Sequence, residues 1–457
     1  MATQSFVGSE TPGHDPWYAS AVDLDEIRNE LDKAPTLRPE GHVCAVTGLR
    51  IAMKLPGARV GDVVRVDRRG RDTLDAEVIG FDEGQVLTVP LGDPVGIGVD
   101  DRVRSTGAPL EVLVGPELLG RVLDGVGRPI DGQPLPAGLR AVTVDRQSPP
   151  PLARGRIERV FPTGVRAIDG LLTMGVGQRL GLFAGSGVGK SSLLSAIARG
   201  AEVDVVVVAL VGERGREVRE FLEDGLGASA RSRAVAVVST SDAPAIERVR
   251  APQTATAIAE AFRDQGARVL LLVDSITRFA RAQREVGLAA GEPPTRRGYP
   301  PSVFYALPRL LERSGPAEHG DITAIYAVLV EGGDLDEPIA DEVRGILDGQ
   351  VVLERSIAAR GRYPAIDLSC SLSRVMPALV SSEHRRWAEN VRQLVTAYEE
   401  KRDLIVLGVY TEGSDPLIDR ALRVMPQIDA FLRQTLDECG DLAETCRELK
   451  RLSSLVS

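Results

Sequence analysis

The stretch that most constrains the fold of this 457-residue chain is 177–194, which reads GQRLGLFAGSGVGKSSLL. Its apolar run 180–183 suits a short buried strand, small residues follow, and apolar residues with helical spacing come after Lys190. Glycines allow backbone N–H groups to close on phosphates, and the start of a helix favours negative charge. The order strand, glycine-rich loop and helix therefore predicts a nucleotide-binding site.

Within this loop, Lys190 would reach the β- and γ-phosphates of ATP, and the hydroxyl of Ser191 would hold Mg²⁺. The strict phosphate-loop pattern has Gly where Ala184 stands, while the last Gly, the Lys and the Ser are in place. The alternative is a glycine-rich turn after a core strand. The expected ATP-binding residues of the loop are Gly185, Ser186, Gly187, Val188, Gly189, Lys190, Ser191 and Ser192.

The chain is acidic, with a net charge of -10, which argues against an extended nucleic-acid footprint. Its four cysteines form no CxxC pair, so reduced thiols in a cytosolic protein are expected. The N-terminus has no signal-peptide pattern, and no stretch approaches 18 uninterrupted apolar residues. These features predict a cytoplasmic protein.

The patterning predicts an α/β protein with four segments. Residues 1–35 read as a mobile segment with a short helix at about 23–31, and 36–107 as a small β-barrel that serves oligomerisation. In 108–375, strands and helices alternate as in a RecA-like, doubly wound ATPase core. Residues 376–457 read as a helical C-terminal domain.

A barrel of this size is either an oligonucleotide-binding module or an assembly collar. Nucleic-acid barrels need stacking aromatics beside basic residues. This region has several arginines but a single aromatic residue, Phe81, so the collar is favoured. The strands expected in the core are 180–183, 203–210, 234–238, 269–273 and 322–330, and the expected helices are 254–265, 302–313, 387–401, 416–420 and 425–439.

Two strand ends carry carboxylates that suit a phosphate-loop enzyme. The aliphatic run 269–273 ends in Asp274, which would contact Mg²⁺ through water or, alternatively, cap a helix. The run 205–211 is followed by Glu213, which could orient the water that attacks the γ-phosphate or lie in an ordinary solvated loop.

The motifs GLFAGSGVGKS, GERGRE and LLVDSITRFARA resemble those of the hexameric rotary-type ATPases, from about residue 40 to the C-terminus. Within that group, the chain resembles most the type III protein-secretion ATPases, through the stretches TGVRAIDGLLTMGVGQRLGLFAGSGVGKS, REVGLAAGEPPTRRGYPPSVFYALPRLLERSG, ADEVRGILDGQVVL and RYPAIDLSCSLSRVM. The resemblance implies an ATPase that works as a homohexameric ring with ATP and Mg²⁺.

The same resemblance implies roles for further residues. Glu213 matches the carboxylate that polarises the attacking water, and Arg214 and Arg278 match arginines around the γ-phosphate. Arg374 matches the arginine finger that each subunit offers its neighbour, and Tyr363 the adenine-stacking tyrosine. For Tyr363 a core position is the alternative, and Tyr410 is a second stacking candidate.

The resemblance also implies partners: stalk and stator proteins, chaperone–substrate complexes and peripheral association with the cytoplasmic face of the inner membrane, without nucleic acid. The proline-rich loop 291–301 would face the central pore. The string 287–298 favours a virulence injectisome over flagellar export. A rotary synthase catalytic subunit and an RNA-translocating hexamer are the remaining alternatives.

Overall fold

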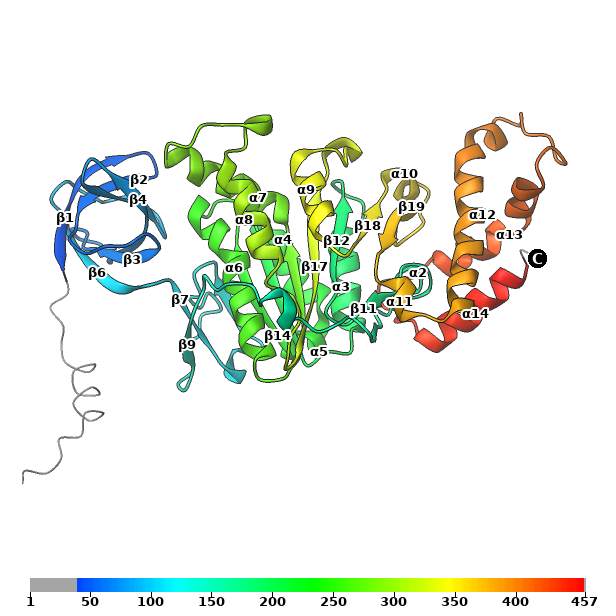
Figure 1. Cartoon of the computed structure of the whole chain (residues 1–457), viewed down its shortest axis with the longest axis horizontal. Helices are drawn as coiled ribbons and strands as arrows, with labels where there is room; N and C mark the ends of the chain where they lie inside the picture. Colours follow the sequence, from blue (N-terminus) through cyan, green and yellow to red (C-terminus); the bar gives the residue numbers. More distant parts are fainter. Residues whose placement is uncertain (1–38, 456–457) are drawn as a thin grey trace, which may run out of the picture.

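The computed structural model describes residues 39–455, which form a β-barrel, a central sheet covered by helices and a helical bundle along the long axis of the molecule (Figure 1). This arrangement confirms the predicted fold class. The helix expected at 23–31 lies outside the described residues.

Six antiparallel strands close the barrel in the order β1-β2-β5-β4-β3-β6. Side chains alternate between the two faces of each strand, so that Val64 and Val66 are buried while Arg65 between them is exposed. The strands are β1 (Glu40–Thr47), β2 (Arg50–Lys54), β3 (Asp62–Val66), β4 (Leu74–Asp82), β5 (Gln85–Pro90) and β6 (Arg102–Pro109).

A buried ion pair joins the barrel to the central domain. Arg250, on α6 (Ala245–Arg263), donates from Nε to Oε2 of Glu77 on β4 over 2.7 Å. Burial lowers the pKa of Arg250 to about 10. Because removal of either partner would leave a buried charge without compensation, this pair fixes the barrel against the core.

The central sheet runs in the order β19-β18-β12-β17-β15-β13-β14-β8, with β16 beside β17. All neighbours on this path are parallel except β18 and β19. Its middle strands are aliphatic and buried on both faces, as β13 shows with VVVVALV. The strands are β8 (Val122–Asp124), β12 (Arg179–Ala184), β13 (Val205–Val211), β14 (Ala234–Ser239), β15 (Arg268–Asp274), β16 (Gly315–Pro316), β17 (Asp321–Leu329), β18 (Gly349–Leu353) and β19 (Ile366–Ser373).

Helices cover both faces of this sheet (Figure 1). The helices between the barrel and the C-terminal bundle are α2 (Arg166–Leu171), α3 (Lys190–Gly200), α4 (Gly215–Glu220), α5 (Gly227–Ser232), α6, α7 (Ile276–Ala289), α8 (Pro301–Leu311), α9 (Pro338–Ile346), α10 (Arg355–Ala359) and α11 (Met376–Leu379). Two small sheets stand apart, formed by β7 (Glu111–Val114) with β9 (Arg140–Thr143) and by β10 (Val160–Phe161) with β11 (Met174–Gly175).

The structure corrects several expected elements. The helix expected at 254–265 begins earlier, at Ala245, and β8 comes from a segment that reads as a connection in the sequence. β8 is only three residues long, so its sequence is too short to show a strand-like hydrophobic periodicity. It forms a strand through its tertiary pairing with β14.

The C-terminal bundle consists of α12 (Ser382–Val406), α13 (Pro416–Leu432) and α14 (Leu442–Ser454). The two helices expected at 416–420 and 425–439 are one helix, α13, which continues through Pro426 and ends at Leu432. α14 was not expected, although it buries Leu449 and Leu452 against the bundle.

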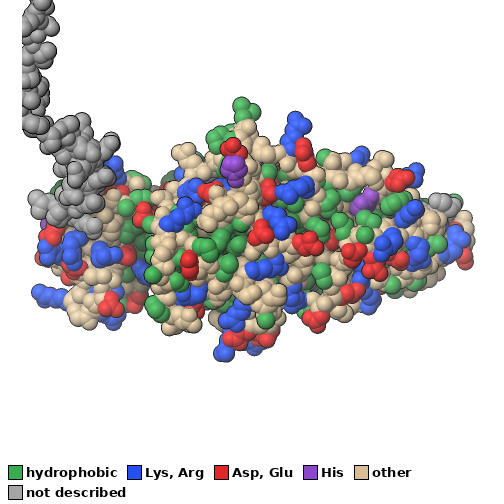
Figure 2. Space-filling view, turned by 90° about the horizontal axis from the view of Figure 1, so that it is seen from below, with side chains coloured by type: hydrophobic (Ala, Val, Ile, Leu, Met, Phe, Trp, Pro, Cys, Tyr) green, Lys and Arg blue, Asp and Glu red, His purple; other side chains and the backbone are tan. Residues whose placement is uncertain are grey.

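Within residues 39–455, no helix combines the length and apolar character needed to cross a membrane. On the face shown in Figure 2, basic and acidic side chains are interspersed over the surface.

Candidate functional site

The phosphate loop lies between the end of β12 and the start of α3, as the sequence predicts. Gly187 and Gly189 have φ values of 79° and 92°, in the left-handed region that other residues rarely adopt. A Cβ built on Gly187 would meet nothing within 4 Å, so the loop encloses an open cradle. Ser191 is exposed in the first turn of α3, beside Lys190.

Three side chains from separate elements meet at this loop. Lys190 Nζ lies 3.3 Å from Oε1 of Glu213 and also contacts Oδ1 of Asp274. Asp274 is the last residue of β15, and Glu213 follows β13. Because β12, β13 and β15 are parallel, their carboxyl ends share one edge of the sheet, and the structure brings together the residues predicted there.

Burial of the Glu213 carboxyl group raises its pKa to about 7, and the negative Asp274 acts in the same direction. The positive charges of Lys190 and Arg278 oppose this rise. The Glu213 side chain is only 9% exposed. A carboxyl group with a pKa near neutrality can accept a proton at physiological pH, which is what a general base requires.

The two arginines expected around the γ-phosphate lie in different places. Arg278, on α7, pairs with Glu213 through Nη2 and Oε2 at 3.2 Å, and its side chain packs against Gly212. Arg214 is 80% exposed and pairs with Glu217 at 3.0 Å. The structure therefore places Arg278 in the charged cluster and Arg214 outside it.

A cavity of about 550 Å³ opens beside the phosphate loop. The ring of Tyr363 lies on one wall, with its Cδ1 atom 3.5 Å from the position that a Cβ on Gly189 would occupy. Another part of the lining comes from residues 433–438, which we call the strap. The strap follows α13, and its residue Gln434 donates its backbone N–H to the Tyr363 carbonyl over 2.9 Å.

The strap is a part of the site that the sequence did not reveal, since 425–439 reads there as continuous helix. The lining of the cavity consists of Val165, Gly189, Ser192, Leu193, Ala196, Gly361, Tyr363, Pro364, Arg433, Gln434, Thr435, Leu436 and Glu438. Tyr410 is not among them. Its hydroxyl donates to Asp419 over 2.7 Å in the turn before α13, so the structure does not support its expected stacking position.

Arg374 lies at the opposite end of the sheet from the phosphate loop. It follows β19, whose last residue, Ser373, pairs with Gly349 at the start of β18. The loop lies beyond the far end of β12, a six-residue strand that spans roughly 20 Å at 3.3 Å per residue. Arg374 is exposed and forms no ion pair with any residue in 39–455.

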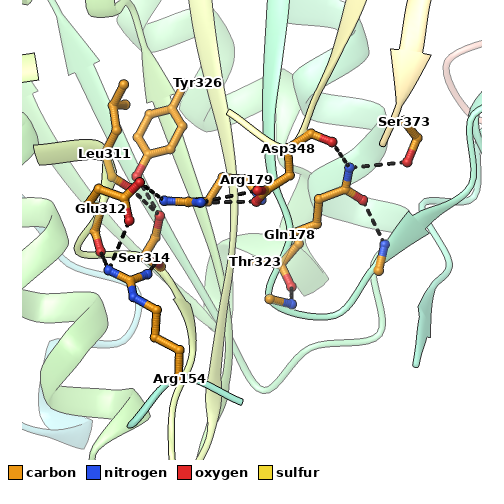
Figure 3. Close-up of polar contacts among 12 residues, drawn as sticks. Arg154, Gln178, Arg179, Leu311, Glu312, Ser314, Thr323, Tyr326, Asp348 and Ser373 are labelled. Atoms are coloured by element: carbon orange, nitrogen blue, oxygen red, sulfur yellow. Dashed lines mark hydrogen bonds and ion pairs between the residues drawn. The ribbon is translucent and has the colours of Figure 1, made fainter. Parts of the chain in front are cut away.

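Polar contacts at the base of β12 fix the backbone that carries Arg374 (Figure 3). Gln178 Nε2 donates to Ser373 Oγ and to the Asp348 carbonyl, each over 3.2 Å. The same Asp348 carbonyl accepts the backbone N–H of Arg374 over 3.0 Å. The Asp348 carboxylate accepts from Arg179 at 3.1 Å through both oxygens.

The proline-rich loop 291–301 joins α7 to α8, and ion pairs hold its arginines. Arg297 lies 3.3 Å from Asp334, and Arg296 lies 3.6 Å from Asp341. Both acids belong to the region that follows β17, so the loop is attached to the segment after a central strand of the sheet.

The described residues contain no group of three or more His, Cys, Asp or Glu side chains suited to holding a metal alone. The cluster does fit Mg²⁺ bound together with a nucleotide. Such an ion keeps several waters and takes one or two protein oxygens in addition to phosphates, and the Ser191 hydroxyl and the Asp274 carboxylate are oxygens of that kind.

Comparison with protein families gives three matches along the chain. Residues 43–107 match the ATP synthase alpha/beta family beta-barrel domain, and 164–373 match the nucleotide-binding domain of the same family. Residues 380–451 match the T3SS EscN ATPase C-terminal domain.

Relatives align over nearly the whole chain. The type 3 secretion system ATPase of Sinorhizobium fredii (strain NBRC 101917 / NGR234) is 52% identical over 91% of this chain and 92% of its own. The flagellum-specific ATP synthase of Bacillus subtilis (strain 168) is 49% identical over 93% and 97%.

Two solved structures agree with this result. The assembled ATPase EscN from the enteropathogenic E. coli type III secretion system superposes with a TM-score of 0.85 at 47% identity, covering 90% of this chain and 100% of that one. EscN in complex with its central stalk EscO gives a TM-score of 0.83 at 46% identity, with the same coverage. This chain therefore belongs to the ATP synthase alpha/beta family, in the branch that holds the type III secretion ATPases and the flagellum-specific ATP synthases.

Proposed function

We propose that this protein is the ATPase of a type III protein-secretion apparatus. It would couple ATP hydrolysis in a homohexameric ring to the release of chaperones and to the unfolding and export of protein substrates. The observation that carries the proposal is the separation within one chain of the Lys190–Glu213–Asp274 cluster from Arg374, at opposite ends of the sheet. Each chain thus holds most of one site and offers an unpaired arginine to another.

The charged cluster supports the following assignment. Lys190 and the loop amides bind the β- and γ-phosphates, and Glu213 polarises the attacking water and accepts its proton. Arg278 positions Glu213 and lies close enough to share the γ-phosphate charge. Ser191 and, through water, Asp274 would hold Mg²⁺, which would supply positive charge beside the phosphates.

Lys190 pairs with Glu213 and Asp274. A phosphate group would compete for the Lys190 ammonium and release the two carboxylates for their roles. Arg214, which is exposed and paired with Glu217, would reach the phosphates only after its side chain turns toward the loop.

Two further residues of the proposed site, Arg374 and Tyr363, lie outside the Lys190–Glu213–Asp274 cluster. Arg374 of one subunit would stabilise the charge that develops on the γ-phosphate in the neighbouring subunit, an effect worth about 10³–10⁵ in rate. Tyr363 would stack on adenine within the cavity beside Gly189, where its ring already forms one wall.

Flagellar export is the second candidate, because relatives of both kinds share about half of their residues with this chain. We infer the injectisome branch from the string at 287–298. Deletion of the gene distinguishes the two: loss of effector secretion with normal motility supports the injectisome, and loss of flagellar filaments contradicts it.

Two further readings have less support. A rotary synthase catalytic subunit works beside a non-catalytic partner, whereas here Glu213 and Arg374 belong to one chain. An RNA-translocating hexamer needs stacking aromatics on its barrel, and Phe81 is the only aromatic residue between 40 and 109.

The proposal extends to partners and location. We infer binding to a stalk protein, as in the structure of EscN with its central stalk EscO, and also to stator proteins and chaperone–substrate complexes. The ring would sit in the cytoplasm, peripherally attached to the cytoplasmic face of the inner membrane.

Hydrolysis measured against protein concentration tests the proposal. Specific ATPase activity should rise as monomers assemble, in parallel with the oligomer fraction from light scattering, because Arg374 completes the site only between subunits. An assembled ring without ATPase activity would contradict the function, and full activity in the monomer would contradict the shared site.

A further inference from the structure

The strap separates two cavities. One is the 550 Å³ cavity beside the phosphate loop, and the other, of about 740 Å³, lies between the strap, α13 and α14. Glu438 lines both cavities. The C-terminal end of the strap therefore lies between the two cavities, and polar contacts contribute to its position there.

Arg166 supplies several polar contacts to the strap, and Arg199 supplies another, from Nη2 to the Leu436 carbonyl. Arg166 begins α2, and its Nε donates to the Phe431 carbonyl over 2.9 Å, while Nη2 donates to the Arg433 carbonyl. The last carbonyls of a helix have no partner within the helix, and a positive charge there is favourable. Arg166 thus caps the end of α13 at the point where the strap begins.

Arg166 also holds the rest of the strap. Its Nη1 pairs with the Glu438 carboxylate, and its backbone N–H donates to Gln434 Oε1 over 2.9 Å. The Gln434 amide in turn donates to the Gly164 carbonyl over 2.6 Å. Both ends and the middle of the strap are therefore attached through Arg166 to the segment that leads into β12.

We propose that Arg166 is a positioning residue for ATP: by fixing the strap against Tyr363, it preforms the cavity for the base and sets the affinity for nucleotide. This inference rests on the proposed function, in which the base occupies that cavity. A strap released from Arg166 would have to be ordered each time ATP binds, and that cost weakens binding.

The same contacts connect the cavity to the helical bundle. α13 runs from the turn after α12 directly into the strap, and Arg166 donates hydrogen bonds to the carbonyls of Phe431 and Arg433 where the two meet.

Steady-state kinetics of the full-length assembled protein test the proposal. Arg166→Ala should raise the KM for ATP about tenfold, the effect of losing a charged hydrogen bond, with kcat within about twofold of the wild type. Inhibition by inorganic tripolyphosphate, which fills the phosphate loop without entering the base cavity, should keep its wild-type constant. Arg166→Lys, which retains the charge on a single donor nitrogen, should recover part of the loss.

The matched control is Arg451→Ala. Arg451 lines the second cavity and pairs with Glu448 and Gln427, outside the strap, so the KM for ATP should not change. An unchanged KM in Arg166→Ala would overturn the proposal, as would a parallel weakening of ATP and tripolyphosphate, which indicates general loosening. A wild-type protein that neither binds nor hydrolyses ATP would instead refute the proposed function.

Discussion

The Lys190–Glu213–Asp274 cluster and the region of Arg374 contrast in how their charges are compensated. In the cluster, every charge faces an opposite charge of the same chain, and the side chains are nearly buried. Arg374 is exposed, its guanidinium donates to the Arg344 carbonyl at 3.3 Å, and its backbone is fixed by the contacts around Gln178.

Because the charges of the cluster are compensated within one chain, this part of the site forms when the chain folds. Arg374 lies about a strand length from the phosphate loop of its own chain, so in the proposed mechanism it acts on the neighbouring subunit. On that proposal, folding of one chain builds the phosphate end of the site and assembly adds the arginine.

The largest effect on hydrolysis is expected from Arg374→Ala. Hydrolysis in the assembled ring should fall about 10³–10⁵-fold, while oligomer size and thermal stability remain those of the wild type. Mixing these subunits with Glu213→Gln subunits should restore activity at roughly one quarter of the interfaces, one half times one half, because each interface is heterologous. If Arg374 acts within its own chain, mixing restores nothing.

The next test addresses the cluster itself. Glu213→Gln should lower kcat about 10²–10⁴-fold, the usual contribution of a general base, with little change in ATP binding measured by equilibrium dialysis. Glu220→Gln is the matched control, since Glu220 pairs with Arg216 at the surface, outside the cluster. Near wild-type turnover in Glu213→Gln would remove Glu213 from the mechanism.

Substitutions in the cavity beside the phosphate loop should have a smaller effect on the kinetics of ATP hydrolysis. Tyr363→Ala should raise the KM for ATP about fivefold to tenfold through loss of stacking, whereas Tyr363→Phe retains the aromatic face and should match the wild type. Tyr410→Phe serves as control, because that hydroxyl lies in the turn before α13. Equal KM values for Tyr363→Ala and the wild type would place the base elsewhere.

The smallest effect concerns pH and the nucleotide-free protein. The pKa of Glu213 rises on folding from 4.5 to about 7, so the folded state binds more protons and stability falls as pH increases through this range. Glu213→Gln does not titrate. Its melting temperature, measured by calorimetry, should exceed that of the wild type by roughly 2–4 °C at pH 8 and converge with it at pH 5. A constant difference at all pH values would show that Glu213 is charged throughout.

The phosphate end of the site could be predicted from the sequence for a local reason. The loop, Asp274 and Glu213 each follow an aliphatic run, and parallel strands bring their carboxyl ends to one edge whatever the loops between them do. The expected strands at 180–183 and 269–273 lie within β12 and β15.

Other parts depend on contacts between distant segments. The sequence predicts that Arg214 and Arg278 share one role, yet only the packing of α7 against Gly212 places Arg278 beside Glu213. The three-residue strand β8 exists because β14 offers it a partner.

The strap shows the same limit most clearly. The periodicity of 425–439 favours an unbroken helix, and nothing in it specifies an end at Leu432. In the structure Arg166, 265 residues earlier, donates from Nε to the Phe431 carbonyl where this helix ends. The phosphate loop could be located from the sequence alone, because strand, loop and helix start are contiguous, whereas the strap beside the cavity depends on contacts between distant segments of the folded chain.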